Sequence, residues 1–411
     1  MIFNTHRFNS LHVFSGFVAF LIALAIAPSL LAVDDVEQSS NVTESSIAPT
    51  NDPWVPLRPL AEHPRTSVNV VEQLRRNHYI RKPIDDTLSS AMFDKYLSML
   101  DGSRSYFLAS DIQTFESLRF TLDDALKDSD LDPAFYIFNR YQQRLLERLN
   151  YSLSLLEQGI DQFNFTVEES LLIDREAAPW PVDSLDQDDL WRRRLKAQIL
   201  SLHLNDKEPA EISEILTKRL RNQIKMAKRN KSEDAFQLYM NAFASTFDPH
   251  TQYFSPRTSE NFNINMSLSL EGIGAVLKIE DDATSIVRLV PAGPAAKSKA
   301  IKPTDKITAV GQGENGPMID IVGWRLDDVV ELIRGPRGSK VRLEVMGANT
   351  DDKTSKRVTI VRNTIKLEEQ AAQAKIIEVN QPQAFGLTPV SKTDNEMPMR
   401  IGVIEIPTFY I

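Results

Sequence analysis

The stretch SLEGIGAVL, residues Ser269 to Leu277, decides how the second half of the chain is interpreted. Two glycines, Gly272 and Gly274, stand between apolar residues that otherwise have the character of a strand. A strand interior normally excludes glycine, because glycine adds flexibility and packs nothing there. The sequence therefore predicts that the backbone bends at this point or that something approaches it closely.

The residues around this stretch predict a small sheet barrel with two helices. Short apolar runs separated by Gly, Pro and Asp replace the long amphipathic stretches found upstream of Phe247. We expect strands in AVLKIEDDATSIVRLVPAG (275–293), DKITAV (305–310), KVRLEVMG (340–347), KRVTIVRN (356–363) and MRIGVIEIPTFYI (399–411), and helices in GPAAKSKAI (293–301) and RLDDVVELIRG (325–335).

A ligand for the glycine pair follows from this order of elements. A bent loop with free amides at the start of a strand can bind a carboxylate through backbone N–H groups. The peptide attached to that carboxylate would pair with the strand from Ala275 to Lys278, and its last side chain would fall between this strand and the helix Arg325 to Arg334. We therefore expect the C-terminus of another chain to bind here.

The residues from about Val68 to Phe247 have helical character. In the clearest helix, Asp132 is expected to cap the first amides, Pro133 suits the first helical position, and Gly159 suits the exit. Further helices are expected over 209–231 and from Ser232, which is expected to act as a cap. The buried stripes of the three helices are Phe138, Tyr141, Leu145, Leu149 and Leu156; Leu216, Leu220, Ile224 and Ala227; and Phe236, Tyr239 and Phe243.

Composition excludes several functions. The chain of 411 residues has no cysteine, so disulfides, thiolate catalysis and cysteine-based zinc sites are absent. Its net charge of -9 argues against a role in binding nucleic acid. Lysines and arginines line one side of the helix over 209–231, and they either hold an acidic partner or form a solvated face.

The N-terminus predicts export. Arg7 precedes an apolar run from Val13 to Ala27, and small residues and then Asp34 and Asp35 follow, which is the order of a secretory signal. We expect residues 1–32 to be a signal peptide, with an uncleaved membrane anchor as the alternative, and residues 33–55 to be a disordered lead-in. The mature protein is expected to be soluble and exported, in contact with the membrane only through the signal sequence before cleavage.

Several motifs together resemble one enzyme family. The stretch EGIGAV is similar to the carboxylate-binding loop of PDZ domains, and VVELIRGPRGSKVRLEV resembles the rest of that domain. The segment FDPHTQYFSPR (247–257) resembles the one that precedes the PDZ domain in C-terminal processing, or tail-specific, peptidases. The resemblance places a peptide carboxylate on the amides of Gly272, Ile273, Gly274 and Ala275, with its last side chain against Leu326 and Val330; Leu268 and Leu270 form a lid or hinge, or pack in the core.

The expected fold class is therefore α+β multidomain, with a helical N-terminal domain, a PDZ-like small β-barrel with two helices, and the start of a truncated α/β protease core. The expected boundaries are 56–247 for the helical domain, 248–350 for the PDZ domain and 351–411 for the incomplete core. Members of the family cleave peptides with a serine nucleophile and a lysine base that follow the segment resembling IGVIEIPTFYI. The chain has no Ser-x-x-Lys spacing and no Gly-x-Ser-x-Gly, so we assign no catalytic residue and expect a fragment that does not itself hydrolyse peptides.

The functional hypothesis is a periplasmic serine endopeptidase that recognises apolar C-termini of substrate proteins through its PDZ domain. The alternative is a non-catalytic PDZ module or adaptor, and a chaperone without preference for C-termini is a third possibility. The family implies lipoprotein adaptors as possible partners. No cofactor or metal is expected, because the sequence has no His-Glu-x-x-His motif and its histidines are scattered along the chain.

Three other motifs have simpler interpretations. GQGENG (311–316) matches Gly-x-Gly-x-x-Gly, but Pro317 follows and no helix starts, so we expect a polar hairpin loop. GPRGSK (335–340) is too short for a phosphate loop and suits a turn. In DPHTQY (248–253) we expect His250 to hold the turn between domains by hydrogen bonds.

Overall fold

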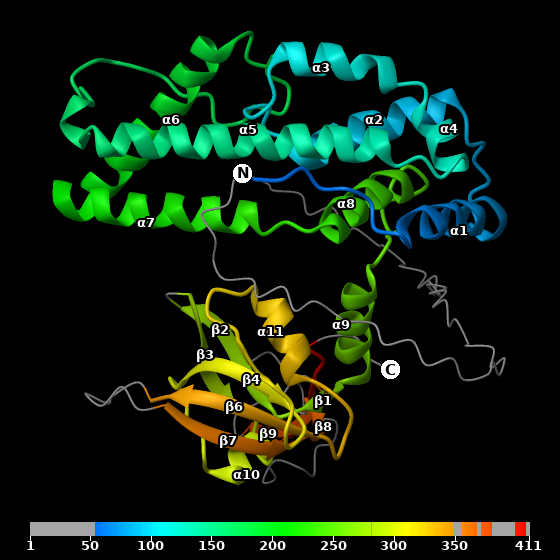
Figure 1. The fold of residues 1–411 in the computed structure, drawn as a ribbon, viewed down its shortest axis with the longest axis vertical. Helices are drawn as coiled ribbons and strands as arrows, with labels where there is room; N and C mark the ends of the chain where they lie inside the picture. The colour runs from blue at the N-terminus through cyan, green and yellow to red at the C-terminus, as the bar shows by residue number, and fades with distance from the viewer. Residues whose placement is uncertain (1–53, 281, 348–354, 368–370, 380–398, 408–411) are drawn as a thin grey trace, which may run out of the picture. The chain divides into compact units, whose positions relative to one another are not determined.

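The computed structural model describes residues 54–280, 282–347, 355–367, 371–379 and 399–407. Helices come first in the chain and strands follow (Figure 1), which confirms the predicted α+β class. The expected signal peptide and nearly all of the expected lead-in lie outside the described residues. None of the described helices combines the length and apolar character needed to span a membrane.

The first part of the described chain is helical. The helices are α1 (His63–Asn77), α2 (Asp86–Asp101), α3 (Ala109–Phe115), α4 (Leu122–Lys127), α5 (Asp132–Glu157), α6 (Ser184–His203), α7 (Pro209–Lys228), α8 (Ser232–Ala244) and α9 (Pro256–Ser267), with short 3₁₀ turns at Glu116–Leu118 and Ile160–Gln162.

The ends of α5 and the start of α8 test the residues that we predicted to begin and end these helices. Pro133 occupies the first turn, and Gly159 takes a φ of 100° just after the helix ends. Asp132 does not cap the helix; instead its amide donates to Asp130 Oδ1 at 2.9 Å. The expected cap at Ser232 is also wrong, because Lys231 precedes the first turn of α8 and its amide donates to Asp234 at 2.8 Å.

Two apolar clusters hold the helices together. The first packs α2, α5 and α8 around fully buried aromatic rings, among them Phe93, Tyr96, Phe236, Tyr239 and Phe243. The second joins the C-terminal half of α5 to α6 and α7, and α7 lies alongside α5 (Figure 1). This cluster contains Leu149, Leu156, Leu195, Leu216 and Leu220. The predicted stripes are therefore the ones that pack, with Tyr141, Leu145 and Ile224 only partly buried.

Six strands of the described chain form an antiparallel sheet. Its order is β2-β3-β4-β6-β7, and β5 pairs with β4. The helix α11 (Leu326–Ile333) packs against β2 and β4, and α10 (Pro294–Ser298) packs against β7. The strands are β2 (Ala275–Glu280), β3 (Ala283–Leu289), β4 (Lys306–Gln312), β5 (Met318–Asp320), β6 (Lys340–Met346) and β7 (Ser355–Val361).

Four more strands of the described residues form two small ribbons. β1 (Ser269–Gly272) pairs with β8 (Asn363–Lys366), and β9 (Gln373–Val379) pairs with β10 (Met399–Glu405), both antiparallel. The predicted strand at the end of the chain is thus present, and its partner lies upstream. Although its sequence is strongly apolar, this strand is not buried, since Ile404 is 72% exposed.

Candidate functional site

The loop between β1 and β2 explains the glycine pair. Gly274 takes a φ of 75°, a left-handed conformation that side chains other than glycine rarely adopt. A Cβ at this position would lie 3.3 Å from Ile365 Cδ1 and 3.4 Å from the Cα of Gly293. Both predicted reasons for glycine therefore apply, because the backbone bends at Gly274 and another backbone segment of the same chain contacts it.

The carbonyl groups of this loop are bound on the inside. The N–H of Ala295 donates to the carbonyl of Ile273, and the N–H of Val290 donates to the carbonyl of Gly274, each at 2.8 Å. In a trans peptide the C=O and the following N–H point in opposite directions. The N–H groups of Gly274 and Ala275 therefore point away from these partners.

The donors of the loop remain available. In the described chain, outside helices and strand ladders, we find no backbone hydrogen bond donated by Ile273, Gly274 or Ala275. Because Val290 bonds to Gly274, the neighbouring pair Ala275–Leu289 is a non-hydrogen-bonded pair of the β2–β3 ladder. The N–H of Ala275 thus faces the edge of β2 that is turned away from β3.

Gly272 does not share this arrangement. It pairs with Asn363 in the β1–β8 ladder, and the N–H of Leu367 donates to the carbonyl of Leu268 at 2.8 Å. Hydrogen-bonded positions alternate along an antiparallel pair, so they fall on Leu268, Leu270 and Gly272. The amide of Gly272 is therefore directed at Asn363, and its predicted role in binding a carboxylate stays a prediction.

The outer edge of β2 carries no strand in the described part of the chain. β2 is the first strand in the sheet order and pairs only with β3 there. An edge strand presents a row of unpaired N–H and C=O groups, which an extended peptide can use to add a strand. Ala275 and Leu277 turn toward the core, whereas Val276 is exposed.

Two apolar side chains of α11 lie beside this strand. Leu326 and Val330 are half-buried and are one helical turn apart, while Val329 and Ile333 are buried in the core of the sheet. The helix α11, which packs against β2, therefore carries one apolar pair that is not buried in the core. We call the amides of Ile273 to Ala275, the edge of β2, Leu326 and Val330 together the α11–β2 face.

Surface cavities among the described residues lie elsewhere. One of about 290 Å³ is lined by residues of α10, β7 and the segment after it, including Lys297 and Arg362. Another of about 180 Å³ lies in the helical part next to Arg192 and Glu169, which already form an ion pair. Neither cavity contains residues of the α11–β2 face.

The turn DPHTQY is held by residues that sequence reasoning missed. Asp248 accepts hydrogen bonds from His78 Nε2 at 2.6 Å, from the Thr251 hydroxyl at 2.6 Å and from the amide of His250 at 2.7 Å. Burial opposes ionisation of Asp248, but these bonds outweigh it and lower its pKa to about 2. His250 therefore holds the turn through its amide, while its side chain is exposed and His78 provides the side-chain contact.

The motifs GQGENG and GPRGSK form turns. Residues 313–317 connect β4 to β5, as predicted for a hairpin loop. Residues 334–339 connect α11 to β6, and both Gly335 and Gly338 have positive φ. No group of three or more His, Asp or Glu side chains among the described residues is arranged to hold a metal ion.

The two halves match two family models. Residues 70–257 match the tail specific protease N-terminal domain, and residues 261–346 match the PDZ domain. The chain carries a tail specific protease N-terminal domain followed by a PDZ domain. The family resemblance expected from EGIGAV and FDPHTQYFSPR is thereby confirmed, whereas the predicted domain boundaries stay predictions.

Curated relatives are similar to this chain over different lengths. The chain is 39% identical to the tail-specific protease of Haemophilus influenzae over 91% of its own length and 51% of that protein. It is 36% identical to the carboxy-terminal processing protease CtpA of Bacillus subtilis over 29% of its length and 25% of that protein. The chain thus spans about half the length of the first relative and a quarter of the second.

One solved structure covers the PDZ part. It is the PDZ domain of a carboxy-terminal protease from Vibrio cholerae in complex with a peptide, 57% identical, covering 24% of this chain and all of that one, with a TM-score of 0.23.

Proposed function

We propose that the PDZ domain binds the free C-terminal end of a polypeptide at the α11–β2 face. The observation that carries this proposal is the direction of the amides in the glycine loop. The carbonyls of Ile273 and Gly274 are bound inside, so the N–H groups of Gly274 and Ala275 point outward. A carboxylate is the group that such convergent N–H donors bind best.

The rest of the peptide would extend the sheet. Residues before the carboxylate would pair with the open edge of β2 over Ala275 to Lys278, as in other cases of strand addition. The last side chain would lie against Leu326 and Val330, which favours apolar C-termini. The proposed site residues are thus Ile273, Gly274, Ala275, Leu326 and Val330, without Gly272.

A pair of peptides tests this proposal. We would label an octapeptide ending in Val-Ala-Val with fluorescein and measure its binding to the chain by anisotropy, once as the free acid and once as the C-terminal amide. The proposal predicts at least tenfold weaker binding of the amide, because a neutral amide loses charge-assisted hydrogen bonds. Equal affinities would contradict it.

For the whole protein we propose the role of a serine endopeptidase that processes the C-termini of exported proteins in the periplasm. Support comes from the names of the relatives, which are tail-specific and carboxy-terminal processing proteases. Sequencing the N-terminus of the protein from a periplasmic fraction tests export. A cleavage assay tests proteolysis, with a substrate that carries an apolar tail as acid or amide.

A further inference from the structure

The helix α9 has a position that the peptide-binding proposal does not use. Its start is tied to α8, because Gln237 Oε1 accepts from the amide of Ser255 at 3.1 Å and from the hydroxyl of Thr258 at 3.0 Å. Its other end reaches Leu268, which is buried in a left-handed conformation, and β1 follows at once. α9 therefore leads through the short strand β1 into the glycine loop.

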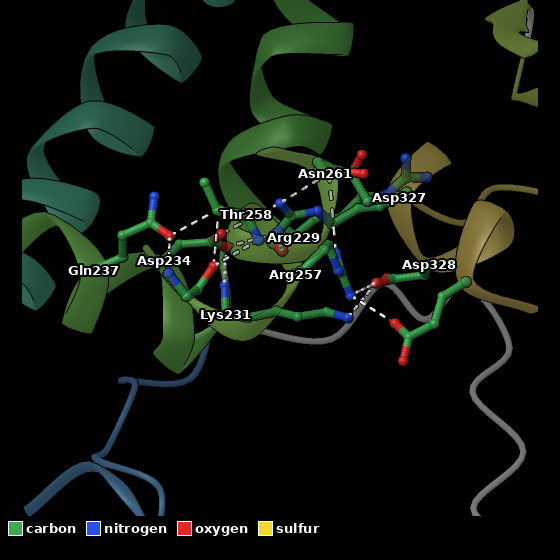
Figure 2. A network of polar contacts seen from close by, with 12 residues as sticks. Arg229, Lys231, Asp234, Gln237, Arg257, Thr258, Asn261, Asp327 and Asp328 are labelled. Carbon is green, nitrogen blue, oxygen red and sulfur yellow. Dashed lines mark hydrogen bonds and ion pairs between the residues drawn. The ribbon is translucent and has the colours of Figure 1, made fainter. Parts of the chain in front are cut away.

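The same helix contacts α11. Arg257 Nη2 donates to Asp328 Oδ1 at 2.8 Å (Figure 2). It also donates to Glu331 Oε2 at 3.0 Å. Asn261 Oδ1 accepts a hydrogen bond from Arg334 Nη1 at 2.8 Å. Because Arg257 and Asn261 are four residues apart on α9, they lie on one face of it. That face contacts α11 both near its first turn and at its C-terminal end.

Asp328 of α11 is contacted by a second cation besides Arg257. Lys231, just before α8, donates to Asp328 Oδ1 at 2.7 Å, so two cations share this carboxylate (Figure 2). Burial raises the pKa of the Asp328 carboxyl, but the hydrogen bonds from Lys231 and Arg257 outweigh burial and lower it. A carboxylate held ionised between two cations keeps α11 in contact with both α9 and the segment before α8.

The N-terminal end of α11 has a second attachment. Arg325, immediately before α11, donates to Asp234 Oδ2 at 2.5 Å and to the carbonyl of Arg229 at 3.1 Å. Asp234 lies in the first turn of α8. The contacts of α11 with α8, with the segment before it and with α9 therefore all involve residues outside the α11–β2 face.

From these contacts we infer that α9 is a positioning element for peptide recognition. The inference rests on the proposed function. One side of the site, Leu326 and Val330, is carried by α11, and the other side, the amide loop, continues from α9 through β1. Arg257 joins the two sides without belonging to the site. It fixes the distance between the apolar pair and the amides, and thereby sets the affinity for a C-terminal peptide.

The test compares two arginines of similar exposure. Arg257→Met removes the contacts to α11, and Arg192→Met removes ion pairs to Glu169 and Asp189 on the helical part; the two side chains are 34% and 32% exposed. Binding of the fluorescein-labelled Val-Ala-Val octapeptide to the whole chain is measured as acid and as amide. Arg257→Met should weaken binding of the acid by about threefold to tenfold, whereas Arg192→Met should leave it unchanged.

Further variants separate positioning from loss of fold. Asn261→Ala should also weaken binding, and Arg257→Lys should fall between Arg257→Met and the unsubstituted chain, because an ammonium reaches fewer acceptors. The melting temperature of each variant is compared with that of Arg192→Met. The inference would be overturned if Arg257→Met and Asn261→Ala both bound the peptide with an affinity within about 1.5-fold of that of Arg192→Met. A difference of that size is about the scatter of such titrations.

The two proposals fail in different ways. If the unsubstituted chain binds acid and amide peptides equally, the peptide-binding proposal is wrong, and α9 has nothing to position. If the unsubstituted chain prefers the acid and the substitutions in α9 do not change its affinity, only the role of α9 is wrong.

Discussion

His78 Nε2 lies 2.6 Å from Asp248 Oδ2, although 170 residues separate the two in the chain. Both side chains are 7% exposed. The Asp248 carboxylate, whose pKa is lowered, can only accept, so Nε2 of His78 is the donor in this hydrogen bond. This pair fastens the end of α1 to the turn that follows α8.

The Asp248 pair predicts a pH dependence of stability. The pKa of Asp248 is lowered from 3.8 to about 2 in the folded chain. A lowered pKa means that the ionised carboxylate stabilises the fold above about pH 4, and this contribution is lost as the pH falls toward 2. We expect Asp248→Asn to lower the free energy of unfolding by about 2 kcal/mol at pH 7 and to flatten its pH dependence between pH 4 and 2.

Urea unfolding at several pH values measures both effects. Glu72→Gln is the control, because the pKa of Glu72 is also lowered to about 2, by Arg75 and Arg76, but this carboxylate lies at the surface. Solvent screening should make the effect of Glu72→Gln much smaller. Parallel pH curves for Asp248→Asn and the unsubstituted chain would rule out this role of Asp248.

The glycine loop predicts a loss of both stability and binding on substitution. Gly274→Ala would place a Cβ against Ile365 and Gly293 at a φ of 75°. We expect it to cost about 1–2 kcal/mol of stability and to abolish detectable peptide binding, because the loop must change conformation. Denaturation and anisotropy measure the two effects.

Gly313 provides the matched control for this substitution. It also has a positive φ, 60°, but no atom lies within 4 Å of the position of its Cβ. Gly313→Ala should cost about 1 kcal/mol and leave peptide binding intact. If both alanine variants bind the peptide normally, the geometry of the Gly274 loop is not needed for recognition.

Neighbouring valines on α11 should behave in opposite ways. Val330 is half-buried on the α11–β2 face, whereas Val329 is fully buried in the core. Val330→Ala should weaken peptide binding severalfold with little effect on stability, and Val329→Ala should cost about 2 kcal/mol of stability. A Val330→Ala variant with unchanged affinity would show that the last side chain of the peptide binds elsewhere.

Arg362 is expected to hold the C-terminal end of α11. Its guanidinium is buried, and it donates to the carbonyls of Ile333 at 2.8 Å and Leu332 at 3.0 Å and to Gln312 Oε1 at 2.6 Å. A cation at this end of a helix is favoured by the helix dipole. Arg362→Met removes the donor to the Ile333 carbonyl and to Gln312 Oε1, whereas the Leu332 carbonyl keeps its hydrogen bond from Gln312 Nε2. We therefore expect a loss of about 2–4 kcal/mol in urea unfolding.

The matched control for Arg362 is Arg119→Met. Arg119 is also a well-connected arginine, but its partners Asp94 and Glu116 are exposed. Water can replace Arg119 there, so its loss should cost about 1 kcal/mol or less. Equal losses for the two variants would contradict the capping role of Arg362.

Local sequence signals predicted some elements and failed for others. α5 was predictable from Pro133, Gly159 and its apolar stripe. α9 was missed because none of its residues is buried, so it has no hydrophobic period to detect. The signal that remained was Ser255 before Pro256, since this serine caps the helix by accepting from the amide of Thr258.

Partners that are distant in the chain were beyond sequence reasoning. The glycine loop could be placed at the start of a strand, but the pairing of Gly272 with Asn363 depends on β8, which was not predicted as a strand. His78 likewise gave no signal, because its partner Asp248 is far away in the sequence. Such contacts follow from the tertiary fold and not from the residues on either side.

The most direct test of the central claim observes the loop amides themselves. With ¹⁵N-glycine labelling, the 15 glycines of the chain give a spectrum in which Gly274 can be assigned through the Gly274→Ala variant. Adding the acid peptide should move the Gly274 amide proton downfield, as expected for a hydrogen bond to a carboxylate, and should leave Gly313 unchanged, while the amide peptide should have little effect. A Gly274 signal that stays in place at a saturating concentration of the acid peptide would contradict the account.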